Sequence, residues 1–414
     1  MIDFDRDTFN VSPQARIKVI GVGGAGGNTL NYMIDGHALH DIDFIVTNTD
    51  AQALSQSYAP VKIQLGTKTT KGLGSGANPD IGKKAAEEDL AKVLEAAENA
   101  DVVFLTGGLG GGTGSGALPV IARALKDRNI LTIAVVTKPF GFEGKRRSVI
   151  AEKALELLAK DVDTLIVVPN QKLLEFSDRS ISLVNAFGMV NEVIFQFVRS
   201  IASIILKPGY INVDFADVKA IMQNMGVAVM GTGKASGKDR AELAALDAIS
   251  SPLLENVSIE GARSILLNIT ASSKLGLHEV HTAASIIQGQ AHKDASIILG
   301  SVIDDTVGDD LYVTVIATGF SCPISYEKEP VREVSPAPIS APEQYYTQSA
   351  PVAQPVHVAA PVEHTPHYSL TQHAQQEKQQ PQASYAQAAQ SAPEDLEIPT
   401  LLRKMVREKQ QLKN

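Results

Sequence analysis

The 414-residue chain lacks tryptophan and has a single cysteine, Cys322. One cysteine excludes an intramolecular disulfide and is typical of a reducing compartment, so we expect a cytoplasmic protein. Aromatic residues make up 5% of the chain, so the core must be mainly aliphatic. No apolar run approaches the roughly 18 residues that span a bilayer, and the acidic N-terminus is unlike a secretory signal. We therefore expect no direct membrane span.

The chain also has no excess of basic over acidic residues. The chain has 37 Lys and Arg against 46 Asp and Glu, a formal net charge of −9. Proteins that bind nucleic acid mainly through its phosphates present a basic surface. We therefore expect no nucleic-acid partner.

Glycine is absent after Gly319, whereas ten of the 20 prolines lie between Pro330 and Pro393. Residues 321–394 are rich in Pro, Gln, Ala and Ser, and such a segment cannot bury enough apolar surface to offset its ordering entropy. We predict a flexible N-terminal segment at 1–12, a disordered linker at 321–394 and a short C-terminal peptide at 395–414. The peptide is amphipathic and locally basic, so a tethered docking segment is an alternative to a frayed, solvated tail, and the residues alone leave both open.

Between these ends, short apolar runs alternate with helical patterns. Near-continuous apolar runs are typical of parallel strands buried on both faces. Strands are predicted at 16–21, 43–48, 102–107, 130–137, 164–169, 262–270, 295–303 and 311–318. Helices are predicted at 80–98, 115–127, 146–160 and 182–206. The pattern indicates an α/β protein: a Rossmann-like domain with a parallel sheet at 13–181, a long central helix at 182–207 and a second α/β domain at 208–320.

Three glycine-rich segments lie in the first domain: GVGGAGGN (21–28), KGLGSGANP (71–79) and GGGTGSG (110–116). A glycine loop between a strand and a helix presents unpaired N–H groups and the positive end of the helix dipole. Loops that follow parallel strands meet at one edge of the sheet. The three segments together predict a site for a di- or triphosphate.

Two common nucleotide-binding classes fit less well. A P-loop needs Gly-Lys followed by Ser or Thr, and none of the four Gly-Lys pairs has this continuation. A dinucleotide-binding oxidoreductase could use the first glycine segment, with Asp50 at a ribose, but it has no need for GGGTGSG at a later turn. That class stays open as an alternative.

GGGTGSG matches the G-G-G-T-G-[ST]-G signature of the tubulin/FtsZ superfamily. Supporting segments stand in the order of that family: NTDAQAL (48–54), TKPFGFEGKRR (137–147) and NVDFADV (212–218). Residues 13–320, the linker and the C-terminal peptide all resemble its bacterial cell-division members. The resemblance implies a GTPase that converts GTP to GDP, polymerises head to tail, and forms the division ring at the future septum on the inner face of the cytoplasmic membrane.

The resemblance also implies roles for individual residues. Backbone N–H groups would bind the phosphates, from Gly24, Ala25, Gly26, Gly27 and Asn28 and from Gly112, Thr113 and Gly114. The terminal phosphate would face Ala77 and Asn78, and the ribose and phosphate region would contact Glu143 and Arg147. Guanine would lie against Phe187, with Asn28 and Asn191 bonding its edge.

NVDFADV contains two carboxylates one helical turn apart, Asp214 and Asp217, with Asn212 before them. From the residues alone, a plain acidic helix cap remains open. The resemblance implies that Asn212, Asp214 and Asp217 are catalytic and complete the site of a neighbouring subunit, with Asp214 and Asp217 also near Mg²⁺. Hydrolysis would then depend on assembly. A member that assembles without hydrolysing GTP is the remaining alternative.

The segment EIPTLLRK (397–404) resembles the family's peptide that binds membrane-tethering and regulatory division proteins. The family often has an aromatic residue where Leu401 stands. The resemblance implies such partners for 395–414, in addition to self-association.

Overall fold

The computed structural model describes residues 15–35, 39, 41–175, 177–178, 180–207, 209, 211, 213–251 and 261–320. The predictions for 1–12, for Asn212, for the linker at 321–394 and for the peptide at 395–414 lie outside these residues.

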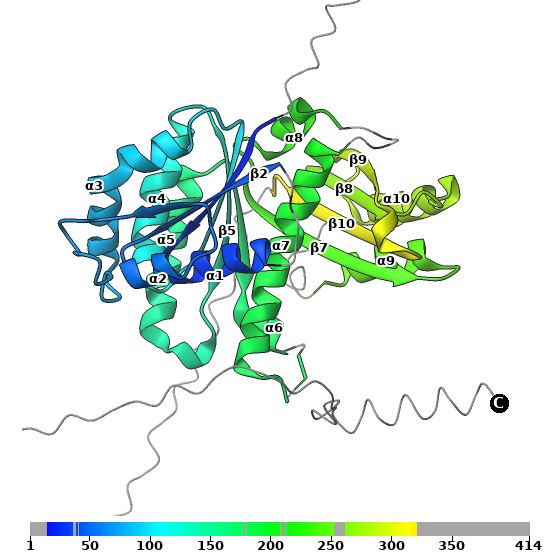
Figure 1. Cartoon of the computed structure of the whole chain (residues 1–414). Helices are drawn as coiled ribbons and strands as arrows, with labels where there is room; N and C mark the ends of the chain where they lie inside the picture. The colour runs from blue at the N-terminus through cyan, green and yellow to red at the C-terminus, as the bar shows by residue number, and fades with distance from the viewer. Residues whose placement is uncertain are drawn as a thin grey trace, which may run out of the picture. The chain divides into compact units, whose positions relative to one another are not determined.

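The described strands form one ten-stranded sheet in the order β3-β2-β1-β4-β5-β6-β7-β10-β8-β9 (Figure 1). Its parallel part consists of β1 (Ile17–Val22), β2 (Ile42–Asn48), β3 (Val61–Gln64), β4 (Val102–Gly108), β5 (Leu131–Lys138) and β6 (Thr164–Pro169). Next to β6 follow β7 (Gly226–Ser236), β10 (Asp310–Thr318), β8 (Ser264–Ala271) and β9 (Ser296–Ile303). β10 pairs antiparallel with β7 and β8, and the other pairs are parallel. The predicted α/β fold with a parallel sheet is confirmed.

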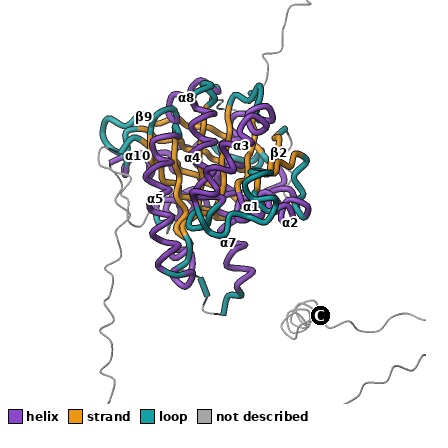
Figure 2. The backbone as a smooth tube through the Cα atoms, turned by 90° about the vertical axis from the view of Figure 1, so that its left-hand side faces the viewer, coloured by secondary structure: helices purple, strands orange, loops and turns teal. Residues whose placement is uncertain are grey.

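Helices cover both faces of the parallel part (Figure 2). One core cluster joins the sheet to α1 (Gly23–Ile34) and α7 (Leu183–Leu206), and another joins it to α3 (Pro79–Ala96), α4 (Thr113–Lys126) and α5 (Lys145–Asp161). Ile17 and Val19 of β1 belong to the first cluster, whereas Ile20 and Val22 belong to the second. Burial on both faces explains why the strands are nearly continuous apolar runs.

Short α-helices are α2 (Ala51–Ser55), α6 (Asn170–Glu175) and α8 (Phe215–Met222). The longer helices α9 (Arg240–Ile249) and α10 (Leu277–Gln290) pack against the last strands. Sequence reasoning missed β3 and β7. β3 has only four residues and buries little of them, and glycines interrupt the apolar pattern of β7.

The long helix α7 is apolar enough, by length and composition, to cross a membrane. Its apolar side, however, is part of the core, where Val190, Ile194, Phe197 and Ile201 are almost completely buried. Figure 1 shows α7 in the middle of the molecule, with strands on both sides. The composition of α7 is therefore that of a core helix.

An ion pair between the buried Arg240 and the partly buried Glu279 ties α9 to α10. The Arg240 guanidinium donates to Glu279 at 2.6 Å from Nε and 3.0 Å from Nη2, and to the Asp309 carbonyl at 2.8 Å from Nη1. The side chain of Arg240 is only 8% exposed. The hydrogen bonds from Arg240 lower the pKa of Glu279. Removing Arg240 would leave the partly buried carboxylate of Glu279 without its main hydrogen-bond donors.

Arg240→Ala is expected to reduce the free energy of unfolding by about 2 kcal/mol in urea denaturation, because Glu279 loses charge-assisted hydrogen bonds. Because the pKa of Glu279 is lowered in the folded state, the pair contributes stability above the ordinary carboxyl pKa, and this is lost as the pH falls through the folded pKa. The variant should therefore lose less stability on acidification. Lys274→Ala, at an exposed ion pair with Asp309, is the control and should cost under about 1 kcal/mol.

Candidate functional site

Two of the glycine segments meet at the edge of the sheet where the strand order reverses. β1 lies between β2 and β4, so the turns after β1 and β4 are neighbours at the carboxyl ends of the strands. Gly23 shows how close they come. It has a φ of +73°, and a Cβ there would lie 3.2 Å from the Gly114 nitrogen and 3.3 Å from Thr113 Cβ. The amino ends of α1 and α4 therefore lie side by side.

Both helices begin inside their glycine segments. α1 starts at Gly23, and α4 at Thr113, earlier than its periodicity predicts because glycine is a poor helix former. Residues 24–26 and 113–114 thus lie in the first turns of helices, and residues 27 and 28 follow in the second turn of α1. Neither helix has a side-chain N-cap or an acidic residue in its first turn. Their first N–H groups are consequently suited to an anion.

The predicted phosphate-binding residues of α1 differ in exposure. Gly24, Ala25 and Asn28 are exposed and Gly27 is partly exposed, so their main chain is open to a ligand. Gly26 is buried, and a Cβ there would lie 2.6 Å from the Thr106 carbonyl oxygen. Gly26 therefore allows α1 to pack against β4.

The third glycine segment packs against the signature. A Cβ on Gly112 would lie 2.3 Å from Ser75 Oγ and 2.7 Å from the Asn78 nitrogen. Asn78 caps α3 by accepting from the Asp80 nitrogen at 3.0 Å, and Pro79 begins the helix, as its sequence position predicts. Ala77 is exposed and takes a φ of +57°, a conformation that non-glycine residues adopt rarely.

Thr113 links three of these loops through its side chain. Its Oγ1 lies 2.6 Å from Thr49 Oγ1, after β2, and 3.1 Å from Ser75 Oγ. All three side chains are buried. Sequence reasoning assigned Thr113 only a backbone role and did not identify Thr49 or Ser75, because nothing in a local pattern indicates which loops touch.

Glu143 and Arg147 lie beside the signature and form an ion pair with each other. Glu143 also accepts from the Phe140 nitrogen at 2.9 Å. A Cβ on Gly110 would lie 2.9 Å from the Arg147 carbonyl oxygen, which places the amino end of α5 against the signature. The Arg147 side chain is 51% exposed, so it can change partners when a charged ligand is bound.

Phe187 and Asn191 project from the first half of α7. The Phe187 ring is 42% exposed and meets the buried Phe140 ring edge to face at 5.2 Å. Asn191 Oδ1 accepts from Thr29 Oγ1 at 2.9 Å, which brings it next to Asn28 on α1. The glycine-rich amino ends of α1 and α4 (residues 24–28 and 112–114) are called the cradle below. An exposed aromatic ring and two amides near it are suited to a nucleotide base.

Glu192, the neighbour of Asn191, connects α7 to α1. It accepts from the Tyr32 hydroxyl at 2.5 Å and from Gln196. Burial and the bond to Glu192 raise the pKa of Tyr32 to about 12, so the hydroxyl keeps its proton and continues to donate. Glu192 therefore has a structural role as the partner of Tyr32. Its neighbour Asn191 is the residue that lies next to Asn28 at the cradle.

The acidic residues lie elsewhere in the molecule. Asp214 is the N-cap residue of α8, its side chain makes no capping hydrogen bond, and Asp217 follows in the first turn. Both are exposed. At the other end of α8, the Met222 carbonyl accepts from Thr164 Oγ1, at the first residue of β6. α8 thus lies at the amino edge of the parallel strands, opposite the cradle, and one molecule does not bring the two together (Figure 1).

No group of three or more His, Cys, Asp or Glu side chains that could hold a metal occurs within the described part of the chain.

Two family models match the chain. The model of the Tubulin/FtsZ family, GTPase domain, matches residues 16–178, and that of the FtsZ family, C-terminal domain, matches residues 226–321. The first match covers the three glycine segments. The GTPase class is therefore favoured over the dinucleotide-binding alternative.

Relatives at the whole-chain level agree. The chain is 45% identical to cell division protein FtsZ of Pseudomonas putida over 95% of this chain and 98% of that protein. It is 48% identical to cell division protein FtsZ of Pseudomonas aeruginosa, over 82% of this chain and 87% of that protein.

Solved structures show the same fold. An empty FtsZ dimer from M. jannaschii matches with a TM-score of 0.70 and 41% identity, over 74% of this chain and 88% of that one. A GTPγS-bound protofilament of CetZ2 from Haloferax volcanii matches with a TM-score of 0.62 over 74% of this chain and 93% of that one, but at 22% identity it supports the fold alone. The chain therefore belongs to the tubulin/FtsZ family of GTPases, among the FtsZ-type cell-division proteins.

Proposed function

We propose that this GTPase assembles head to tail and that each GTP site is completed by the acids of the next subunit. The observation that carries the proposal is the position of Asp214 and Asp217 at the edge of the sheet opposite the cradle. Carboxylates that cannot reach the cradle of their own molecule can reach one only when a second copy stacks against it. The FtsZ dimer of M. jannaschii supports self-association of this kind.

In the cradle, we assign the phosphates to the backbone of 24–28 and 112–114, because these residues lie at the amino ends of α1 and α4, where the positive ends of the helix dipoles are uncompensated. Ala77 and Asn78 would face the terminal phosphate. Guanine would lie against Phe187, with Asn28 and Asn191 at its edge. Glu143 and Arg147 would exchange part of their mutual ion pair for the ribose and phosphates.

The acids of the neighbouring subunit would act on the water that attacks the terminal phosphate. Asp217 and Asp214 can orient and polarise that water, and Asn212 precedes them in the same segment. Mg²⁺ fits the arrangement, because it is commonly held by one or two carboxylates together with substrate phosphates. When bound there, it would offset negative charge on the phosphates.

A head-to-tail contact that does not close into a ring grows into a filament. The terminal phosphate lies at that contact in this arrangement, so its loss on hydrolysis would weaken the filament. We further propose that 13–181 and 208–320 act as separate domains joined by 182–207. The peptide 395–414, carried by the linker 321–394, would bind membrane-tethering and regulatory division proteins. This would place the filament in the division ring at the inner face of the cytoplasmic membrane.

The test is the GTPase rate of the full chain, measured against protein concentration together with light scattering. We expect both signals to rise from a shared threshold concentration, because an isolated subunit lacks the acids. Scattering without phosphate release would favour the alternative of a non-hydrolysing polymer. Separated subunits that hydrolyse GTP at the full specific rate would refute completion of the site between subunits.

A further inference from the structure

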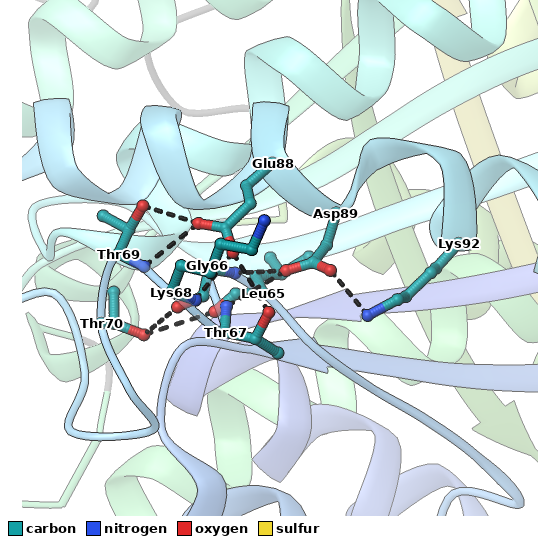
Figure 3. A network of polar contacts seen from close by, with 9 residues as sticks. All are labelled: Leu65, Gly66, Thr67, Lys68, Thr69, Thr70, Glu88, Asp89 and Lys92. Atoms are coloured by element: carbon teal, nitrogen blue, oxygen red, sulfur yellow. Dashed lines mark hydrogen bonds and ion pairs between the residues drawn. The ribbon is translucent and has the colours of Figure 1, made fainter.

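Two neighbouring carboxylates on α3 hold one tight turn of the chain (Figure 3). Glu88 Oε1 accepts from the Lys68 nitrogen at 2.7 Å and from Thr67 Oγ1 at 3.1 Å. Glu88 Oε2 accepts from the Thr69 nitrogen at 3.1 Å and from Thr69 Oγ1 at 2.7 Å. One side chain thus satisfies four donors from three consecutive residues.

Asp89 completes the set from its buried position. Its Oδ2 accepts from the Gly66 nitrogen at 2.7 Å and the Thr67 nitrogen at 3.2 Å, while Oδ1 pairs with Lys92 at 2.7 Å. The backbone of Asp89 departs from helical geometry, with φ −111° and ψ 16°. All four N–H groups of residues 66–69 therefore donate to two adjacent carboxylates.

These contacts suit ionised carboxylates, which only accept hydrogen bonds. The bonds from Thr69 Oγ1 and the Lys68 nitrogen lower the pKa of Glu88 to about 2. Glu88 therefore stays ionised near neutral pH.

The turn is connected directly to the cradle. Thr70 follows it, and its backbone nitrogen donates to the Gly66 carbonyl at 2.7 Å. Its Oγ1 lies 3.2 Å from the Thr49 carbonyl, to which it can donate its single proton. The Thr49 carbonyl also accepts from the Gly74 nitrogen at 3.1 Å. Thr49 Oγ1 lies 2.6 Å from Thr113 Oγ1 of the signature. A short chain of hydrogen bonds thus runs from the turn to the signature.

The segment that follows needs such a support. Gly72, Gly74 and Gly76 have positive φ angles, as do Lys71 and Ala77. Glycine loses more conformational freedom on ordering than other residues do. If the turn at 66–69 were loose, binding a ligand would also have to order 71–78, and affinity would fall.

We infer that Glu88 and Asp89 are positioning residues that hold the turn 66–69, so that the segment 71–78 is already placed to contact the terminal phosphate of GTP. This inference rests on the proposed function, in which Ala77 and Asn78 face that phosphate. GDP, which lacks the phosphate, should depend much less on the same support.

The experiment compares affinities for GDP and for a non-hydrolysable GTP analogue in the full chain, by competition with a fluorescent nucleotide. In Glu88→Ala, we expect the affinity for the analogue to fall about tenfold and that for GDP to change less than about threefold. Asp89→Asn should act in the same direction. Glu88→Gln keeps the shape with one accepting oxygen and should lie between Glu88→Ala and the unmodified chain.

Glu87→Ala is the matched control, because Glu87 is the preceding residue on α3, is exposed, and pairs only at 3.9 Å with Lys83. It should leave the ratio of the two affinities unchanged. If Glu88→Ala lowers both affinities equally, or leaves both intact, Glu88 has no positioning role. If Glu88→Ala does not fold by circular dichroism, Thr69→Val removes a single bond to Glu88 and is judged by the same ratio. An unmodified chain that binds neither nucleotide would refute the proposed function instead.

Discussion

Asp217→Asn is expected to lower the rate of GTP turnover by at least about 10²-fold while nucleotide affinity stays unchanged. Asp217 is exposed in the first turn of α8, at the edge of the sheet opposite the cradle. The substitution keeps the size of the side chain and removes the charge that would polarise the attacking water. Phosphate release during assembly and equilibrium binding of GDP measure the two effects separately.

Glu242→Gln is the matched control, since Glu242 is an exposed carboxylate in the first turn of another helix, α9. It should hydrolyse GTP at the rate of the unmodified chain. Phosphate release by Asp217→Asn at that same rate would remove Asp217 from the reaction.

Gly112→Ala is expected to weaken nucleotide binding at least about tenfold and to lower the melting temperature. The added Cβ would lie 2.3 Å from Ser75 Oγ and within 2.9 Å of the backbone nitrogen and oxygen of Asn78. Backbone atoms cannot move aside as the end of a flexible side chain can, and overpacking of this kind costs about 1–3 kcal/mol. The wall of the cradle would have to separate from the signature. Binding of fluorescent GDP and thermal melting test both effects.

Gly111→Ala is the control, because a Cβ on the adjacent glycine would meet nothing within 4 Å. It should melt at the temperature of the unmodified chain. Equal loss of melting temperature in the two variants would show that packing against Ser75 and Asn78 is not what requires glycine at 112.

Mixing the Asp217→Asn and Gly112→Ala proteins tests whether the site forms between subunits. Asp217→Asn keeps an intact cradle, and Gly112→Ala keeps intact acids. If the site forms between subunits, a mixture of the two contains some contacts with both intact parts, and it should release phosphate at a rate above the sum of the separate rates. A rate equal to that sum would indicate that cradle and acids act within one molecule.

The regular part of the fold could be predicted from the sequence. Strands such as 102–107 and 164–169 are buried on both faces, so apolar side chains appear at nearly every position, and the pattern is visible locally. Glycine segments between a strand and a helix are equally local, which is why the turns that begin α1 and α4 were predictable. β3 and β7 were missed because partial burial and glycines hide their pattern.

The sequence by itself determined the α/β fold, the glycine cradle and the pair of acids in NVDFADV, because each depends on neighbouring residues and their intrinsic conformations. Only the tertiary structure decided which loops touch, as in the contact of Thr113 with Thr49 and Ser75. It also decided that Glu88 and Asp89 hold the turn 66–69, and that α8 lies at the edge opposite the cradle. The physical reason is that strand order and helix packing bring distant segments together, and no local pattern of residues encodes that order.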